Sequence, residues 1–303
     1  MSFSSDTKNE IAALAIADDC CARAELLAVI CFCGRLRADS LVMATENPKV
    51  AKRVYELIKF AFGITAALDL QHAPLCQVRL GKEADVLKVL RGVGLLDDTA
   101  VLQSLVRFHV EPDKLPRACC KKSFLRGAFL TAGSLIHPEK HYHLEFVTHH
   151  YVLSRDFAAV LQALSFAPKT IVRKSNYVLY FKNSEEIADL LAAIGAHRTL
   201  MEYHNVRIVK EVRNNVNRQV NCETANVEKT VSASMRQTEG IKKLEQRGIL
   251  GSLPQNLQDI ARLRLDNPEL SLTELGQLVR PPISKSGVNH RLRKIAELAE
   301  KLK

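Results

Sequence analysis

An internal repeat is the feature of this sequence that narrows its possible folds the furthest. The segment CCARAELLAVICFCGRL, residues 20–36, aligns with CCKKSFLRGAFLTAGSL, residues 119–135, at an offset of 99. Similar helical and alternating patterns follow both segments, so each copy predicts a helix, two strands, a helix, two strands and a helix. Repeats at about 20–94 and 119–196 most simply form one pseudo-two-fold α+β domain with helices on one face of its sheets. The other sheet face is then free to bind a partner.

Small residues occupy equivalent positions in the first helix of each copy. Ala28 and Gly127 align with one another, and we expect them to let the two helices pack closely. Gly34 and Gly133 follow six residues later, at the helix ends. We expect both to adopt the left-handed conformation of a C-terminal cap.

This pattern resembles the LAGLIDADG homing endonuclease fold. In that family two such helices pack along the pseudo-axis, and their ends deliver acidic metal ligands to DNA that lies on the sheets. The acid stands immediately before the last glycine, where this sequence has Cys33 and Ala132. Without a carboxylate at either position, Mg²⁺ lacks the oxygen ligands that a nuclease centre needs. The resemblance therefore implies a retained scaffold with degenerate former active-site positions and no catalytic residues.

A histidine-rich segment is a candidate metal site. On a strand, alternation would place His141, His143, Glu145 and His149 on one face. Three interpretations are open: a Zn²⁺ site, a polar surface facing DNA or a partner, and solvated residues on the wet side of a half-buried strand. The last two are favoured, so no metal is assigned.

Cysteines form a second candidate. Cys31, Cys33 and the pairs Cys20-Cys21 and Cys119-Cys120 contain the ligands of a soft-metal site, but no paired Cys-x-x-Cys motifs occur. Free cysteines often pack as small apolar residues, and we favour that structural role. The sequence therefore predicts neither a metal nor a cofactor.

Positive charge is concentrated toward the C-terminus. The 303-residue chain has a net charge of +10; residues 213–303 carry 16 basic and 10 acidic side chains, against 27 and 23 in residues 1–212. Such a gradient favours a polyanionic partner, because Lys and Arg that neutralise phosphates release counterions. A solvated basic tail is the alternative.

The composition changes after about residue 200. Four asparagines fall within Arg213 to Asn221, which indicates a boundary or an exposed helix start. We expect the repeat domain over 1–200, a linker over 201–223 and an all-α domain over 224–303. The fold class predicted is thus α+β, a tandem-repeat LAGLIDADG-like domain followed by a helix-turn-helix domain.

The C-terminal residues predict three helices with defined ends. Pro254 opens one helix, Ser271 caps a second with Glu274 as its capping-box partner, and Ser284 caps a third that runs to about Leu302. The last two, joined by a short turn, form a helix-turn-helix candidate.

A rotation of about 100° per residue assigns faces to the last helix. The residues expected to face the core are Val288, Leu292, Ile295 and Ala299. Those expected to face the bases of DNA are Ser286, Asn289, His290 and Arg293, and those expected to meet phosphates are Lys285, Arg291 and Lys294. A plain amphipathic basic helix is the alternative.

Three long strings resemble the signatures of the WhiA family of bacterial DNA-binding regulators. They are NRQVNCETANVEKT (217–230), LPQNLQDIARLRLDNPELSLTELG (253–276) and ISKSGVNHRLRKI (283–295). The resemblance covers essentially the whole chain. It implies transcriptional control linked to cell division, chromosome behaviour or sporulation, with double-stranded DNA as partner and the transcription machinery or another regulator as further candidates.

The sequence also favours a cytoplasmic, nucleoid-associated protein. Its longest stretches without charged side chains have twelve residues, fewer than the roughly 20 that cross a bilayer. The polar start, Ser2 to Glu10, lacks a signal-peptide pattern, so we expect no membrane partner and reduced thiols. Two other functions stay open: an active nuclease, and a nucleoid-associated or partner-docking protein with little role at promoters.

Overall fold

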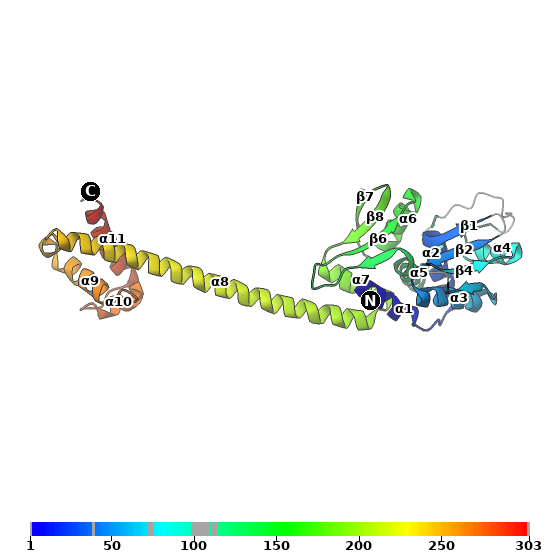
Figure 1. Ribbon diagram of the computed structural model, residues 1–303, viewed down its shortest axis with the longest axis horizontal. Helices are drawn as coiled ribbons and strands as arrows, with labels where there is room; N and C mark the ends of the chain where they lie inside the picture. Colours follow the sequence, from blue (N-terminus) through cyan, green and yellow to red (C-terminus); the bar gives the residue numbers. More distant parts are fainter. Residues whose placement is uncertain (1, 38–39, 72–74, 98–108, 111–113, 302–303) are drawn as a thin grey trace. The chain divides into compact units, whose positions relative to one another are not determined.

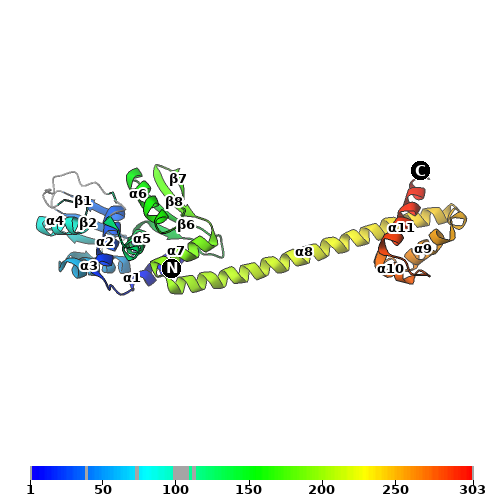
Figure 2. The ribbon, with the colours of Figure 1, turned by 180° about the vertical axis from the view of Figure 1, so that it is seen from behind.

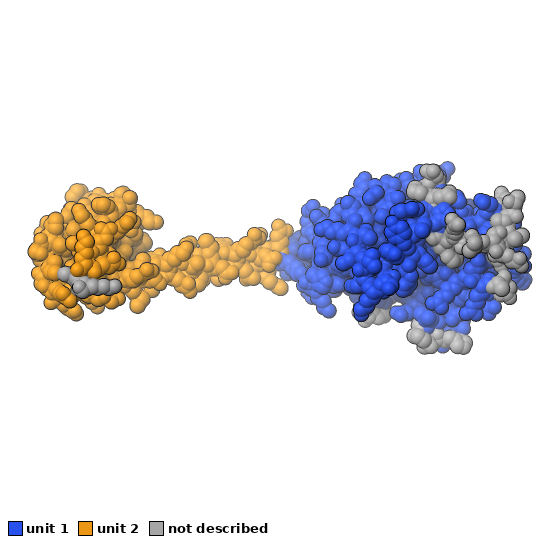
Figure 3. All heavy atoms as spheres, turned by 90° about the horizontal axis from the view of Figure 1, so that it is seen from above, with its two compact units in different colours: residues 1–210 blue, residues 211–303 orange. Residues whose placement is uncertain are grey.

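The computed structural model describes residues 2–37, 40–71, 75–97, 109–110 and 114–301. The chain forms two compact units, residues 1–210 and 211–303 (Figure 3). Each unit has its own hydrophobic core; that of the first extends from Ile11 to Tyr203, and that of the second from Ile241 to Ile295.

The first unit contains the predicted repeat (Figure 1). After helix α1 (Phe3–Ala12), the first copy comprises α2 (Asp19–Cys33), β1 (Gly34–Leu36), β2 (Leu41–Thr45), α3 (Pro48–Phe62), β3 (Ala67–Asp69), β4 (Cys76–Leu80) and α4 (Glu83–Gly92). The second comprises α5 (Ala118–Ala132), β5 (Gly133–Leu135), β6 (Leu144–Thr148), α6 (Tyr151–Gln162), β7 (Lys169–Arg173), β8 (Asn176–Phe181) and α7 (Ser184–Ile194). The predicted succession of elements is confirmed in both copies.

Each copy builds one antiparallel sheet. The strand orders are β1-β2-β4-β3 and β5-β6-β8-β7, which are equivalent under the repeat. Helices α2 and α5 lie side by side between the two sheets (Figures 1 and 2). The α+β fold expected from the repeat is therefore present.

The two central helices approach closely at Gly127. A Cβ atom there would stand 2.3 Å from the Glu25 carbonyl oxygen and 2.9 Å from the Ala28 Cβ. No side chain fits at such distances, so the expectation that Ala28 and Gly127 permit close packing is confirmed.

The expectation for Gly34 and Gly133 is wrong. Neither is left-handed: Gly34 has φ −71° and ψ 137°, and Gly133 has φ −80° and ψ 145°, so both are extended and begin strands. The chain here turns directly from helix into strand, over the last helical turn. A Cβ at Gly34 would lie 2.4 Å from the Ile30 oxygen, and one at Gly133 would lie 2.7 Å from the Phe129 Cα. Space, not backbone conformation, requires glycine.

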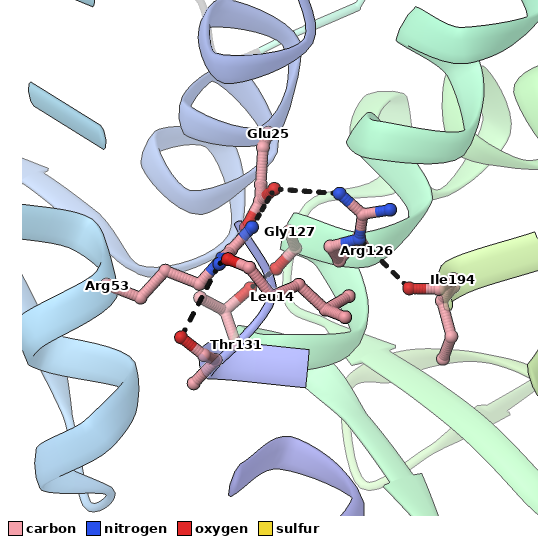
Figure 4. A network of polar contacts seen from close by, with 8 residues as sticks. Leu14, Glu25, Arg53, Arg126, Gly127, Thr131 and Ile194 are labelled. Atoms are coloured by element: carbon pink, nitrogen blue, oxygen red, sulfur yellow. Dashed lines mark hydrogen bonds and ion pairs between the residues drawn. The ribbon is translucent and has the colours of Figure 1, made fainter. Parts of the chain in front are cut away.

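A buried polar network joins the two copies (Figure 4). The Arg53 guanidinium donates to both carboxylate oxygens of Glu25 and to the Leu14 carbonyl, 2.6 Å away. Arg126 of the second copy contacts the same carboxylate at 3.4 Å and donates to the Ile194 carbonyl at 2.9 Å. One acid thus links α2, α3, α5 and the end of α7.

Helix α8 (His197–Gln246) contributes residues to both units. The segment 201–223, expected as a linker, lies within it, and the side chains of 211–233 are exposed. The helix is continuous because neither Gly nor Pro occurs between Gly195 and Gly240, and asparagine costs a helix less than one kcal/mol, ~0.7 at most. The helix start suggested by the asparagines is therefore wrong.

The second unit continues with a short 3₁₀ turn, η2 (Leu250–Ser252), and three helices. These are α9 (Gln255–Asp266), α10 (Leu272–Leu278) and α11 (Lys285–Glu300). No helix in the described ranges has the length and apolar character needed to cross a membrane.

Candidate nucleic-acid interface

Helices α9, α10 and α11 pack around the core of the second unit. Val288, Leu292 and Ile295 of α11 are at most 2% exposed and belong to the same buried cluster as Ile260 and Leu275. The core face predicted by rotation is confirmed, with Ala299 packed at its edge. This packing fixes which face of α11 remains outside.

Side-chain caps define where α10 and α11 begin. The Glu274 amide donates to Ser271 Oγ at 3.3 Å, and the Ser271 amide donates to Glu274 Oε2 at 2.8 Å, which confirms the capping box. These hydrogen bonds lower the pKa of Glu274 from its ordinary value. Ser284 Oγ accepts from the Gly287 amide at 3.2 Å, so the expected start of α11 is confirmed as well.

A glycine brings α10 against the entry of α11. The Ile283 amide donates to the Gly276 carbonyl at 3.0 Å. A Cβ on Gly276 would lie 2.4 Å from the Ile283 oxygen, so only glycine fits. The turn between the two helices is therefore held by main-chain contact as well as by the core.

A buried arginine holds the connection between α9 and α10. Arg264 is 2% exposed, and its Nη1 donates to the Leu270 carbonyl at 2.7 Å and to the carbonyls of Asn267 and Pro268, each at 3.4 Å. Burial lowers the pKa of its guanidinium. Arg264 is not among the residues predicted from the sequence. A signal was available in the sequence: helical spacing places Arg264 on the apolar face formed by Leu257 and Ile260, and charged residues are rarely buried unless they are paired.

The outer face of α11 carries the residues predicted to meet the bases. Ser286, Asn289, His290 and Arg293 are all exposed. They extend along the helix from its first turn to its middle. Their role toward DNA stays a prediction.

The three residues predicted to meet phosphates differ from one another. Lys285 and Lys294 are exposed. Arg291 is half-buried, and its Nη1 donates to the Asn256 carbonyl in α9 at 3.5 Å. Arg291 therefore contributes to holding α11 against α9 in addition to any contact with DNA.

Basic side chains outnumber acidic ones around this face. Residues 275–296 contain no Asp or Glu, and the exposed Arg280 adds a cation just before α11. Arg293 pairs with Glu297 at 3.2 Å, but this pair is largely exposed, so solvent screens it and a phosphate can replace the carboxylate. The arrangement suits a polyanion.

The former nuclease positions lie in the first unit, where Cys33 and Ala132 end α2 and α5. Cys33 Sγ donates to the Val29 carbonyl at 3.2 Å, and burial raises the pKa of the thiol to about 12. The thiol is therefore neutral. Burial lowers the pKa of Lys8 in α1, whose side chain interacts electrostatically with Glu46 and with Cys33.

The histidine-rich segment is arranged differently from expectation. Strand β6 spans only Leu144–Thr148, so the expectation of one strand that carries all four residues is wrong, although His141 and His143 still lie together, with ring centroids 6.1 Å apart. His143 Nε2 lies 3.0 Å from Glu145 Oε2, and the imidazole stacks on Tyr180. Within the described part of the chain these residues belong to no group of three candidate metal ligands.

Family models match three parts of the chain. They describe the WhiA N-terminal LAGLIDADG-like domain over residues 19–74, the WhiA LAGLIDADG-like domain over 121–213 and the WhiA C-terminal HTH domain over 216–299. They cover the first copy as far as residue 74, the second copy from residue 121 and the face of α11 described above.

Similar full-length proteins and a solved structure are known. "Probable cell division protein WhiA" of Clostridium perfringens strain 13 is 43% identical over 100% of this chain and 99% of its own. The protein of that name from Alkaliphilus metalliredigens is 41% identical over 99% and 98%. The crystal structure of full-length DUF199/WhiA from Thermatoga maritima matches 99% of each chain with a TM-score of 0.60 and 25% identity.

Proposed function

Because the chain belongs to the WhiA family, we propose that it is a sequence-specific DNA-binding protein that regulates transcription in connection with cell division, chromosome segregation or sporulation. Its partner is double-stranded DNA, so we place it in the cytoplasm at the nucleoid. The transcription machinery or another regulator is a further candidate partner. The curated relatives are named as cell division proteins, which supports the cellular process.

One observation supports the proposal: the exposed face of α11 combines side chains able to pair with bases and a basic border in which residues 275–296 contain no Asp or Glu. Asn289 has the amide geometry that pairs bidentately with adenine, and Arg293 has the forked donors that pair with guanine. Lys285 and Lys294 stand beside them, where phosphates flank a helix in the major groove. The capped turn between α10 and α11 holds this face rigidly.

We further propose that the protein does not cut DNA. Cys33 and Ala132 provide no carboxylate at the two helix ends, and a neutral thiol is a poor ligand for Mg²⁺. Incubating the purified protein with supercoiled plasmid and Mg²⁺ tests this. Nicking that disappears in a variant of the first unit would overturn it.

Genome-wide occupancy, measured together with transcript levels, tests the regulatory role against a nucleoid-associated or partner-docking one. We expect discrete sites that share a base motif, near genes whose transcription changes when Asn289→Ala replaces the wild type. Even coverage of the chromosome without a motif would support the alternative. Asn289→Ala keeps Lys285 and Lys294, so it also serves as the matched control for non-specific binding.

A further inference from the structure

Four cysteines meet at the N-terminal ends of the two central helices. Cys20 and Cys21 belong to the first turn of α2, and Cys119 and Cys120 to the first turn of α5. The Sγ atoms of Cys20, Cys21 and Cys119 all lie within 4.8 Å of one another, and that of Cys119 lies 4.0 Å from Cys120 Sγ. The repeat thus assembles two Cys-Cys pairs that neither copy could combine alone.

Three of these four thiols, all but that of Cys120, are more exposed than the cysteines that fill the core. Cys31 is 3% exposed and Cys120 is 5% exposed, as expected for apolar packing. Cys20 and Cys21 are half-buried and Cys119 is exposed, so for Cys119 the expected structural burial is wrong. A small apolar role does not explain why these sulfurs gather at the surface.

Two helix N-termini and several basic side chains lie beside this cluster. Two helices of 15 residues each direct their N-terminal dipole ends toward the cluster. A cavity of about 560 Å³ beside it is lined by Cys20 and Cys120 together with Arg23, Lys114 and Arg117. None of the described residues that line this cavity is acidic. Arg23 is paired with Asp19 at 2.7 Å, so Lys114, Arg117 and the two helix ends supply the positive charge that offsets several thiolates around one cation.

We propose that Cys20, Cys21 and Cys119 bind one soft d¹⁰ cation, Zn²⁺ or Cu⁺, with Cys120 within reach as a fourth ligand. Thiolates select these ions over hard ones such as Mg²⁺. With Zn–S bonds of about 2.3 Å, the sulfurs of a tetrahedral site are about 3.8 Å apart. The observed separations of up to 4.8 Å require a contraction that side-chain rotation supplies.

This site is separate from the former nuclease positions. Cys20 and Cys33 stand near opposite ends of α2, and a rise of about 1.5 Å per residue puts them roughly 20 Å apart. The cation links the start of α2 to the start of α5 and so cross-links the two copies of the repeat. The inference is independent of DNA binding by α11, because it concerns the first unit alone.

Metal titration of the full-length, reduced and metal-free protein tests the site. In one arm the protein competes with a chromophoric chelator for Zn²⁺, and in the other, under anaerobic conditions, with a chelator for Cu⁺. We expect one equivalent bound. Co²⁺ in place of Zn²⁺ should give sulfur-to-cobalt charge-transfer absorption and the visible bands of a tetrahedral ion.

Variants locate the ligands. Cys119→Ser should lower the affinity at least about 100-fold, since even outer-shell partners of a metal ligand are worth 10- to 100-fold. Cys222→Ser removes an exposed cysteine of α8 and is the matched control, which should bind as the wild type does. If Cys119→Ser fails to fold, bound metal in the wild type should protect Cys20, Cys21 and Cys119, but not Cys222, from alkylation followed by mass spectrometry. The proposal would be overturned if the protein competed for neither ion, or if metal protected Cys222 alone. It would also be overturned if protein that binds no metal formed a disulfide between Cys21 and Cys119 under mild oxidation.

Discussion

Glu25 is the residue at which both copies of the repeat and the segment after α1 converge. Its side chain and that of Arg53 are each 2% exposed, so the carboxylate and the guanidinium compensate one another without water. Arg126 adds a second cation from the other copy. Breaking a buried pair of this kind strongly lowers the free energy of unfolding, because the partner left behind is an uncompensated charge.

Glu25→Gln should therefore lower the free energy of unfolding of the first unit by about 3 to 5 kcal/mol. Denaturant unfolding followed by circular dichroism measures it. Asp19→Asn is the matched control, since the Asp19 to Arg23 pair is exposed on the same helix and such pairs contribute about 0 to 1 kcal/mol. Equal effects of the two substitutions would contradict the role given to Glu25.

Residues of α11 should separate into two kinds of effect on DNA binding. Replacing Asn289 or Arg293 by Ala should cost about 1 to 3 kcal/mol at the cognate site and relax preference at one base position. Replacing Lys285 or Lys294 should weaken specific and non-specific binding alike and make the salt slope shallower by roughly one unit. Binding-site selection at two salt concentrations measures both.

The opposite pattern would show that the face of α11 is assigned incorrectly. That pattern is an unchanged base preference in Asn289→Ala and Arg293→Ala with an altered one in Lys294→Ala. Arg291→Ala is a separate case, because its hydrogen bond to the Asn256 carbonyl predicts a loss of stability alongside any loss of affinity. Thermal unfolding of the same variants distinguishes the two.

At the scale of elements, the capping box of α10 makes the stability of the second unit depend on pH. Hydrogen bonds to Ser271 lower the pKa of Glu274 below its unfolded value, so its contribution is present above the ordinary carboxyl pKa of about 4.3 and is lost as pH falls through the lower folded value. Wild type should exceed Glu274→Ala in stability at neutral pH, and the two should converge in acid. A difference that grows in acid would contradict this sign. Thermal unfolding across pH measures it.

Helix α8 should be unevenly protected along its length. Side chains 211–233 are exposed, whereas Tyr203 near its start and Ile241 near its end are buried. Because helices without tertiary packing open locally, amides of 211–233 should exchange with deuterium faster than those around Tyr203 and Ile241. Hydrogen exchange read by mass spectrometry supplies this comparison within one helix. Uniform protection along α8 would indicate a partner for its middle.

The elements that sequence predicts well are those whose ends depend on local chemistry. Ser271, Glu274 and Ser284 act on amides three residues away, so they fix the helix starts without knowledge of the fold. Gly34 and Gly133 were misassigned because their requirement is contact with the preceding helical turn, and the start of α8 was missed because asparagines weaken a helix without ending it. At the candidate site, the outward face of α11 follows from helical period, whereas the bond from Arg291 to Asn256 and the burial of Arg264 depend on how α9 packs, which periodicity does not contain.

At the scale of the whole molecule, each unit has a core of its own, so the two units can be assigned separate functions. The repeat unit keeps the two sheets and paired helices of its fold but has Cys33 and Ala132 at the helix ends. Most of the net positive charge, by contrast, belongs to residues 213–303. This division predicts that DNA affinity belongs to the second unit.

A fragment of residues 1–212, which retains the whole core of the first unit, should therefore bind a natural target far more weakly than the full chain. The affinity of the full chain should fall steeply with salt, because each phosphate contact releases about 0.9 counterion and several cations of α11 act together. The fragment should show a smaller slope, in proportion to its lower density of positive charge. Fluorescence anisotropy with one labelled duplex over a range of salt concentrations measures both slopes, and circular dichroism of the fragment confirms that it is folded. If the folded fragment bound the duplex as tightly as the full chain and with the same slope, the sheets of the repeat unit and not α11 would be the principal DNA-binding surface.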